Sequence, residues 1–220
     1  MSSSARPLWL NQMKITVLSR KGSFHKESED TIAVNDTVFH EGEKQFDRDS
    51  IYMICVADGV GGNEGGRLAS TFIAQRFASI NTDTLCSTDI RQMILNFNEE
   101  LLEYADGSDM ATTLSGIILS ENTIWVIHCG NTRIYKKQGK YLRQLTIDQT
   151  TYKILTDLNL NEEAESCNKS EIYGCFGGGN NKFAQKVFVS AECLRELPEL
   201  LIFTSDGIHD YVDESSMEEI

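Results

Sequence analysis

The segment IYMICVADG, at residues 51–59, decides how the rest of the chain is interpreted. Its first seven residues form the longest uninterrupted apolar run in the sequence. A run of this length predicts a strand buried on both faces and is too short to span a membrane. The segment LLIFTSDG, at residues 200–207, follows the same design, so that one run ends at Asp58 and the other at Asp206. Because an isolated carboxylate at the rim of a core is costly, the two aspartates predict a cation site.

A simple turn is the alternative interpretation of each Asp-Gly pair, since this pair is common in turns. Asp106 and Gly107 follow polar helical sequence, and we interpret them as a turn only. Gly59 has a second use, because a glycine can leave its carbonyl free to approach an ion. Two long apolar runs that both end in Asp-Gly favour the metal site over two unrelated turns.

A third acidic element, Glu29-Asp30, introduces the apolar stretch around residues 32–34. Adjacent side chains at the start of a strand point to opposite faces, so at least one of the two carboxylates can point inward. A solvated Glu-Asp pair is the commoner alternative. Oxygen ligands alone select hard cations, and we therefore expect Mg²⁺ or Mn²⁺. Carboxylates from different strands can hold two ions roughly 3.5–4 Å apart, as in-line attack on a phosphate ester requires.

The remaining pattern predicts strands and helices in separate blocks. Apolar residues at helical spacing predict helices at 68–80 and 90–104, and a short helix is expected at 151–158. The predicted strands lie at 13–19, 32–39, 51–57, 112–119, 123–129, 132–136, 140–145, 186–190 and 200–204, with a polar loop at 40–50. Blocks without βαβ alternation indicate an α+β fold with antiparallel sheets. We expect a loose leader at residues 1–12 and a single domain at 13–220.

Composition narrows the possible partners. The chain has 220 residues and 24.7 kDa, with 20 Lys and Arg against 33 Asp and Glu, so its net charge is −13. Such a field repels nucleic acid and anionic membranes, and we expect neither as a partner. The six cysteines contain no C-x-x-C pair, and no secretory signal is apparent, which predicts a reduced, cytoplasmic protein.

Several catalytic motifs do not occur in the sequence. There is no H-x-x-x-H zinc pattern and no G-x-x-x-x-G-K-[ST] phosphate-binding loop. His128-Cys129 resembles the start of a cysteine-phosphatase loop, but position 135, where that loop needs arginine, is Tyr135. The chemistry is therefore expected to depend on carboxylates.

Taken in order, the motifs resemble those of the protein phosphatase 2C (PPM) family of metal-dependent Ser/Thr phosphatases, in its bacterial form. The resembling segments are ADGVGGNEGGRLAS at 57–70, MATTL at 110–114, GNTRIY at 130–135, LTIDQT at 145–150 and TSDGIHD at 204–210. Residues 25–30, HKESED, are a degraded form of the opening Arg-x-x-Asn-Glu-Asp. One such motif occurs often by chance, whereas five in the family's order do not.

The resemblance implies a four-layer αββα sandwich in which a water or hydroxide between two Mn²⁺ or Mg²⁺ ions attacks phosphorus. It implies catalytic roles for Asp58 and Asp206. The implied ligands are Asp58 bridging both ions, the Gly59 carbonyl, Asp206 on the first ion, Glu29 and Asp30 on the second, and Asp148 on a third, weaker ion. The implied partners are phosphorylated protein substrates and a cognate Ser/Thr kinase.

Two departures from the family pattern leave an alternative open. His25 stands where the family has the arginine that binds the substrate phosphate, and a histidine is only partly charged near neutral pH. The family pattern continues with a helix and a strand carrying an Asp-Asn pair, so the domain is expected to be incomplete at its C-terminus. Both departures favour a catalytically impaired, phosphatase-like binding or regulatory module as the alternative. A generic acidic α+β protein is the third interpretation.

Overall fold

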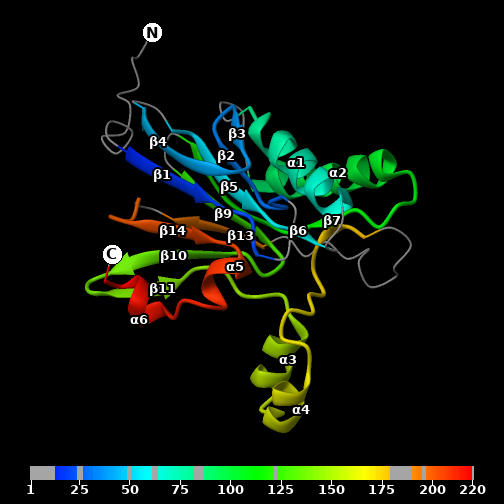
Figure 1. Cartoon of the computed structure of the whole chain (residues 1–220). Helices are drawn as coiled ribbons and strands as arrows, with labels where there is room; N and C mark the ends of the chain where they lie inside the picture. The colour runs from blue at the N-terminus through cyan, green and yellow to red at the C-terminus, as the bar shows by residue number, and fades with distance from the viewer. Residues whose placement is uncertain are drawn as a thin grey trace.

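The computed structural model describes residues 13–23, 27–48, 51–60, 64–81, 87–120, 123–178, 190–194 and 197–219. Its largest sheet has six antiparallel strands in the order β13-β9-β8-β5-β2-β3. The bounds are β13 Ser190–Leu194, β9 Thr123–Cys129, β8 Leu114–Ser120, β5 Met53–Ala57, β2 Thr31–Val34 and β3 Thr37–Phe39. Figure 1 shows this sheet at the centre of the molecule.

Smaller antiparallel sheets complete the β structure. Two of them pack on one face of the large sheet: β1 (Met13–Ser19) with β4 (Gly42–Arg48), and β11 (Tyr141–Gln144), β10 (Arg133–Gln138) and β14 (Leu201–Thr204) in that order. A third sheet consists of three short strands in the order β12 (Phe176–Gly177), β7 (Ala111–Thr112) and β6 (Gly59–Val60). In the chain, β6 follows β5 with only Asp58 between them.

Helices occupy three positions around the sheets. Two long helices, α1 (Glu64–Ala78) and α2 (Ser87–Ala105), cover the second face of the large sheet. Two short helices, α5 (Asp206–His209) and α6 (Glu214–Met217), follow β14. The remaining pair, α3 (Thr151–Asp157) and α4 (Asn161–Ser166), extends away from the sheets (Figure 1). The prediction of an α+β fold with antiparallel sheets and helices is confirmed.

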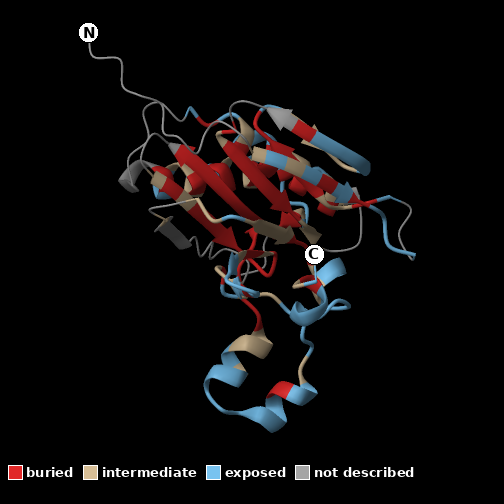
Figure 2. Ribbon diagram, turned by 90° about the vertical axis from the view of Figure 1, so that its left-hand side faces the viewer, coloured by how far each residue is buried: buried red, intermediate tan, exposed pale blue. Residues whose placement is uncertain are grey.

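The apolar run at 51–57 is explained by a core on each side of β5. Met53, Cys55 and Ala57 pack in the cluster between the sheet and the helices. Ile54 and Val56, which alternate with them, pack in the cluster between the two β layers. Both faces of β5 are therefore covered, and Figure 2 shows burial concentrated in these layers, while α3 buries no residue and α4 buries only Ala164.

Some predicted elements differ from the structure. The predicted polar loop at 40–50 contains β4, which pairs with β1 along its whole length. Leu68 and Tyr104 were predicted on core-facing stripes, but both are exposed, and Tyr104 stacks on Phe72 with ring centroids 5.1 Å apart. Of the predicted strand at 186–190, residues 186–189 lie outside the described part of the chain, as do the leader residues 1–12. No helix among the described residues is long and apolar enough to cross a membrane.

Candidate active site

Three aspartates from different parts of the chain converge at one edge of the β layers. Asp58 follows β5, Asp206 begins α5 after β14, and Asp30 precedes β2. In the β2–β5 ladder Thr31 pairs with Ala57, so the next residues outward, Asp30 and Asp58, lie beside each other. The Asp58 carboxyl group lies close enough to both other carboxyl groups to share a hydrogen bond with either when one of the two is protonated. The structure therefore brings together two carboxyl groups next to strand ends of the large sheet and one that follows β14 of the β11-β10-β14 sheet.

Hydrogen bonds with Thr112, the last residue of β7, and with Thr113, between β7 and β8, fix the backbone of Asp58. Its N–H donates to Thr113 Oγ1 at 3.1 Å, and its carbonyl accepts from the Thr113 N–H at 2.9 Å. The Thr112 hydroxyl donates to the same carbonyl at 2.8 Å. The backbone that carries the Asp58 carboxyl group is thus held from two directions where β5 meets the short sheet.

The other two aspartates each accept one hydrogen bond from a neutral side chain. The Ser205 hydroxyl donates to Asp30 Oδ2 at 2.8 Å, and the Asn131 amide donates to Asp206 Oδ2 at 3.2 Å. The Ser70 hydroxyl of α1 donates to the Glu29 carbonyl at 2.6 Å, which fixes the segment that carries Asp30. The Ser205 and Asn131 donors orient the carboxyl groups without neutralising their charge.

Burial and mutual repulsion raise the pKa of two of the carboxyl groups. Desolvation is the main cause for Asp58, whose pKa lies well above its ordinary value, and the charges of Asp30 and Asp206 raise it further. Desolvation also raises the pKa of Asp30, although the hydrogen bond from Ser205 partly opposes this. Without a cation the cluster therefore tends to retain protons, since crowded buried carboxylates cannot all ionise at low cost.

Glu29 lies beside the cluster, against the first turn of α1. A Cβ atom added to Gly66 would lie 2.7 Å from Glu29 Oε2. A Cβ atom added to Gly59 would lie 2.4 Å from the carbonyl carbon of Gly66, so the backbones of β6 and α1 meet where only glycine fits. The charge of Glu29 also contributes to the raised pKa of Asp30.

Asp148 lies in an ion pair instead of in the aspartate cluster. Arg133 donates from Nε to Asp148 Oδ1 at 3.0 Å and from Nη2 to Oδ2 at 2.6 Å, and Gln144 Nε2 donates to Oδ1 at 2.8 Å. Burial alone would lower the pKa of Arg133, but its hydrogen bonds to Asp148 and to the Tyr135 hydroxyl raise it, so the guanidinium stays charged. A role for Asp148 as a ligand of a third ion remains a prediction, and this geometry does not favour it.

The donor set of the cluster suits a hard divalent cation. Asp30, Asp58 and Asp206 offer only oxygen atoms, and a cation would relieve the repulsion that raises the pKa of Asp58. As the described side chains stand, no three or more His, Cys, Asp or Glu residues among them are arranged to hold a metal ion. His25, the predicted phosphate ligand, lies outside the described residues.

Sequence reasoning missed the residues that support the cluster. Ser205, Thr113 and Gly66 lie inside the resembling motifs, so the motifs were a signal, but no role was assigned to these residues. Asn131 lies in the resembling segment GNTRIY and was likewise given no role, whereas its amide donates to Asp206. Each of these contacts joins segments that are distant in the sequence, and local pattern carries no information on them.

Comparisons with known proteins agree with the motifs. A family model described as protein phosphatase 2C matches residues 34–220. A putative protein phosphatase of Mycoplasma pneumoniae is 24% identical over 96% of this chain and 84% of that protein. The serine/threonine phosphatase stp of Listeria monocytogenes is 27% identical over 79% of this chain and 73% of that protein.

Solved structures share the fold. The Mycobacterium tuberculosis serine/threonine phosphatase PstP/Ppp has a TM-score of 0.71 at 21% identity, covering 94% of this chain and 84% of that one. The catalytic domain of PstP in complex with two manganese ions has a TM-score of 0.70 at 21% identity, covering 94% of this chain and 83% of that one. At this level of identity the structural likeness concerns the fold alone.

Proposed function

The chain belongs to the protein phosphatase 2C family, and on that premise we propose that it hydrolyses phosphoserine and phosphothreonine in proteins with the help of divalent metal ions. One observation carries the proposal: Asp58, directly after β5, lies beside both Asp30 and Asp206, which are far from it in the sequence on either side. Two relatives named serine/threonine phosphatases support the substrate class.

The carboxyl groups of Asp30, Asp58 and Asp206 would hold two Mn²⁺ or Mg²⁺ ions, with the Gly59 carbonyl as a further oxygen donor. When bound, the ions would lower the pKa of a coordinated water and offset negative charge on the phosphoryl oxygens. Glu29 would contribute directly or through water. The PstP structure with two manganese ions supports this choice of metal.

The surrounding residues of this chain would orient the carboxyl groups for that task. Thr112 and Thr113 fix the Asp58 backbone, while Ser205 and Asn131 each direct one carboxyl oxygen of Asp30 and Asp206. Because the pKa values of Asp58 and Asp30 are raised, binding a cation must displace protons from them. We therefore expect metal affinity, and with it turnover, to increase with pH.

The test compares Asp58→Asn with Asp106→Asn. Asp106 is the aspartate of the Asp-Gly pair interpreted as a turn, and its φ of 46° is a conformation that asparagine also adopts. With p-nitrophenyl phosphate and millimolar Mn²⁺, we expect Asp58→Asn to lose at least about 100-fold in kcat, because metal catalysis contributes several kcal/mol. Asp106→Asn should match the wild type. Equal activity of the two variants would refute the proposal.

A phosphatase-like binding module is the second candidate function. It is favoured by the finding that the described residues contain no ready-made metal geometry. Calorimetric titration with a phosphopeptide, in the absence and in the presence of Mn²⁺, separates the two candidate functions. A binding module would bind the phosphopeptide without Mn²⁺ and would not hydrolyse it. Opposition to a cognate Ser/Thr kinase and a cytoplasmic location are further parts of the proposal that follow from the family resemblance.

A further inference from the structure

The β10–β11 hairpin concentrates positive charge in a chain whose net charge is −13. Residues 133–143 contain five Lys and Arg and no Asp or Glu. Arg133 is paired with Asp148. The other four are here called the hairpin cations: Lys136, Lys137, Lys140 and Arg143. Of these, only Lys136 is half-buried, and the other three are exposed.

The hairpin cations form no ion pairs inside the described part of the chain, although the Glu218 side chain lines the same hollow as Lys137 and Lys140. Lys140 Nζ lies over the ring of its neighbour Tyr141 at 5.0 Å. The strand register places Lys136 directly opposite Arg143. Like charges facing each other across a ladder are destabilising. A local cost of this kind without internal compensation is expected where a surface binds an oppositely charged partner.

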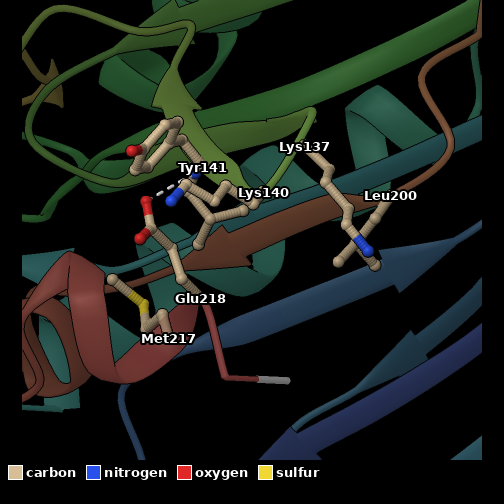
Figure 3. A pocket seen from close by; sticks show the side chains of 7 residues that line it. Lys137, Lys140, Tyr141, Leu200, Met217 and Glu218 are labelled. Carbon is tan, nitrogen blue, oxygen red and sulfur yellow. Dashed lines mark hydrogen bonds between the residues drawn. The ribbon is translucent and has the colours of Figure 1, made fainter.

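One acidic side chain already binds at this surface. Glu218, which follows α6, accepts a hydrogen bond from the backbone N–H of Leu142 at 2.8 Å. Figure 3 shows Glu218 facing the hairpin, in a shallow hollow whose lining includes Lys137, Lys140 and Tyr141. The hairpin edge thus shows that a carboxylate can be accommodated here, bonded to a strand amide and close to lysine side chains.

The hairpin leads directly away from the aspartate cluster. Arg133 pairs with Thr204, two residues before Asp206, and Lys136 pairs with Leu201 on the same strands. At about 3.3 Å per residue, the first hairpin cation lies roughly 10 Å along the strand from the cluster end. An extended peptide whose phosphorylated residue lies at the cluster needs about three to five further residues to reach the hairpin cations.

We propose that the hairpin cations dock an acidic stretch of the phosphoprotein substrate, about three to eight residues from the phosphorylated residue. The inference rests on the proposed phosphatase function and narrows its substrate class. Elsewhere the acidic surface of the chain repels such a stretch, so the hairpin would set the direction in which the substrate lies. Electrostatic complementarity of this kind acts mainly on association and therefore on KM.

The test uses two peptides that differ only in the segment about three to eight residues from the phosphothreonine. One peptide carries four Glu residues in this segment, and the matched peptide carries four Gln residues. At low ionic strength we expect the wild-type KM for the Glu peptide to be roughly five- to tenfold lower, with kcat unchanged. The double variant Lys137→Glu, Lys140→Glu should abolish the preference. Lys140→Glu should reduce it, while Arg91→Glu, the same charge change at an exposed position on α2, should leave it intact. Equal KM values for both peptides in the wild type, or equal effects of Lys140→Glu and Arg91→Glu, would overturn the inference.

Two further measurements separate this inference from the proposed function. Turnover of p-nitrophenyl phosphate, which cannot reach the hairpin, should be the same in the wild type and the hairpin variants. If no protein turns it over, the phosphatase proposal fails, and fluorescence anisotropy with the unphosphorylated Glu peptide still tests docking. Loss of binding in the double variant supports the inference. Equal competition by a single-stranded oligonucleotide of the same charge would overturn it in favour of a nucleic-acid surface.

Discussion

At the scale of single residues, Gly59 and Gly66 fix how closely helix α1 approaches Asp58, the residue after β5. A Cβ atom at Gly59 would lie 2.4 Å from both the carbonyl carbon and the carbonyl oxygen of Gly66. These are backbone atoms, which cannot move aside as a flexible side chain can. The contact therefore couples the position of α1 to the position of Asp58.

Gly59→Ala is expected to lower the free energy of unfolding by about 3 kcal/mol, because the added methyl group must separate α1 from β6. Urea denaturation in the presence of EDTA measures this. Gly65→Ala is the matched control, since its Cβ would meet Met110 Cγ at an ordinary 3.5 Å. Within a helix, alanine should be neutral or stabilising by up to about 1 kcal/mol there. Equal midpoints for the two variants would contradict the packing argument.

His209 should make stability depend on pH. Burial lowers its pKa to about 4, and Nδ1 is hydrogen-bonded to Thr204 Oγ1 at 2.9 Å. Between pH 6.5 and 4 the unfolded chain binds a proton that the folded chain does not, so stability falls as the pH falls through this window. The loss should reach about 3 kcal/mol for this residue alone.

Urea denaturation at pH 7 and pH 4.5 checks this sign, and His209→Gln should remove much of the difference between the two pH values. Burial also lowers the pKa of His128, so part of the slope will remain in the variant. A slope that is unchanged in His209→Gln would exclude a contribution from this side chain.

The sequence was informative about residues where burial forces a choice of side chain. Asp58 and Asp206 were predicted because each ends an apolar run, and the structure places their carboxyl groups in contact. Ser205 and Asn131 could not be predicted as their partners, because a single serine or asparagine in a loop has many alternative roles. Their function depends on which distant carboxyl group the fold brings within 3.2 Å.

At the scale of elements, the Arg133–Asp148 pair joins the start of β10 to the segment that precedes α3. Its three hydrogen bonds use both carboxyl oxygens of Asp148, and both side chains are mostly buried. The neighbouring Gln149 continues this link, because its Oε1 accepts from the Gly130 N–H at 3.0 Å. The projecting α3–α4 pair is thus anchored beside the aspartate cluster by a fixed ion pair.

Asp148→Asn should lower the free energy of unfolding by about 2 kcal/mol, since it leaves a partly buried guanidinium without its counter-charge. The number of Mn²⁺ ions bound in calorimetric titration should not change if Asp148 serves the ion pair only. Asp157→Asn is the control, because it breaks the exposed Lys153–Asp157 pair, for which about 0.5 kcal/mol or less is expected. Loss of one bound ion in Asp148→Asn would restore the predicted ligand role.

Elements whose faces are largely buried were predicted well, and the mostly exposed β4 and α4 were not. The run at 51–57 identified β5 because both its faces are covered by core clusters. In β4, Phe46 is buried while residues 42–45 are exposed, so its apolar pattern is weak, and its pairing with β1 supplies the strand. Likewise α4 buries only Ala164, and no helix was predicted there.

At the scale of the whole molecule, the aspartate cluster lies where the two β layers meet. Asp58 and Asp30 lie directly beside the ends of β5 and β2 of the large sheet, and Asp206 begins α5 just after β14 of the β11-β10-β14 sheet. Their repulsion acts between layers that the apolar cluster beneath them holds together. A divalent cation would reverse the sign of this interaction and join the layers, so metal binding and stability should be coupled.

Asp58→Asn should therefore make the metal-free protein more stable while abolishing its response to Mn²⁺. The pKa values of Asp58 and Asp30 are raised above 3.8, so in the wild type stability is lost as the pH rises through the folded-state values. At pH 7 in EDTA the variant should gain on the order of 2 kcal/mol, and near pH 3.5 the difference should vanish. With Mn²⁺ at 100 times its dissociation constant, the wild type should gain about 2.7 kcal/mol per site, and the variant much less.

Urea denaturation at both pH values, with EDTA or Mn²⁺, measures all four states. A variant less stable than the wild type at pH 7 in EDTA would mean that the three carboxyl groups do not repel one another, and the electrostatic argument for a cation between the layers would fail.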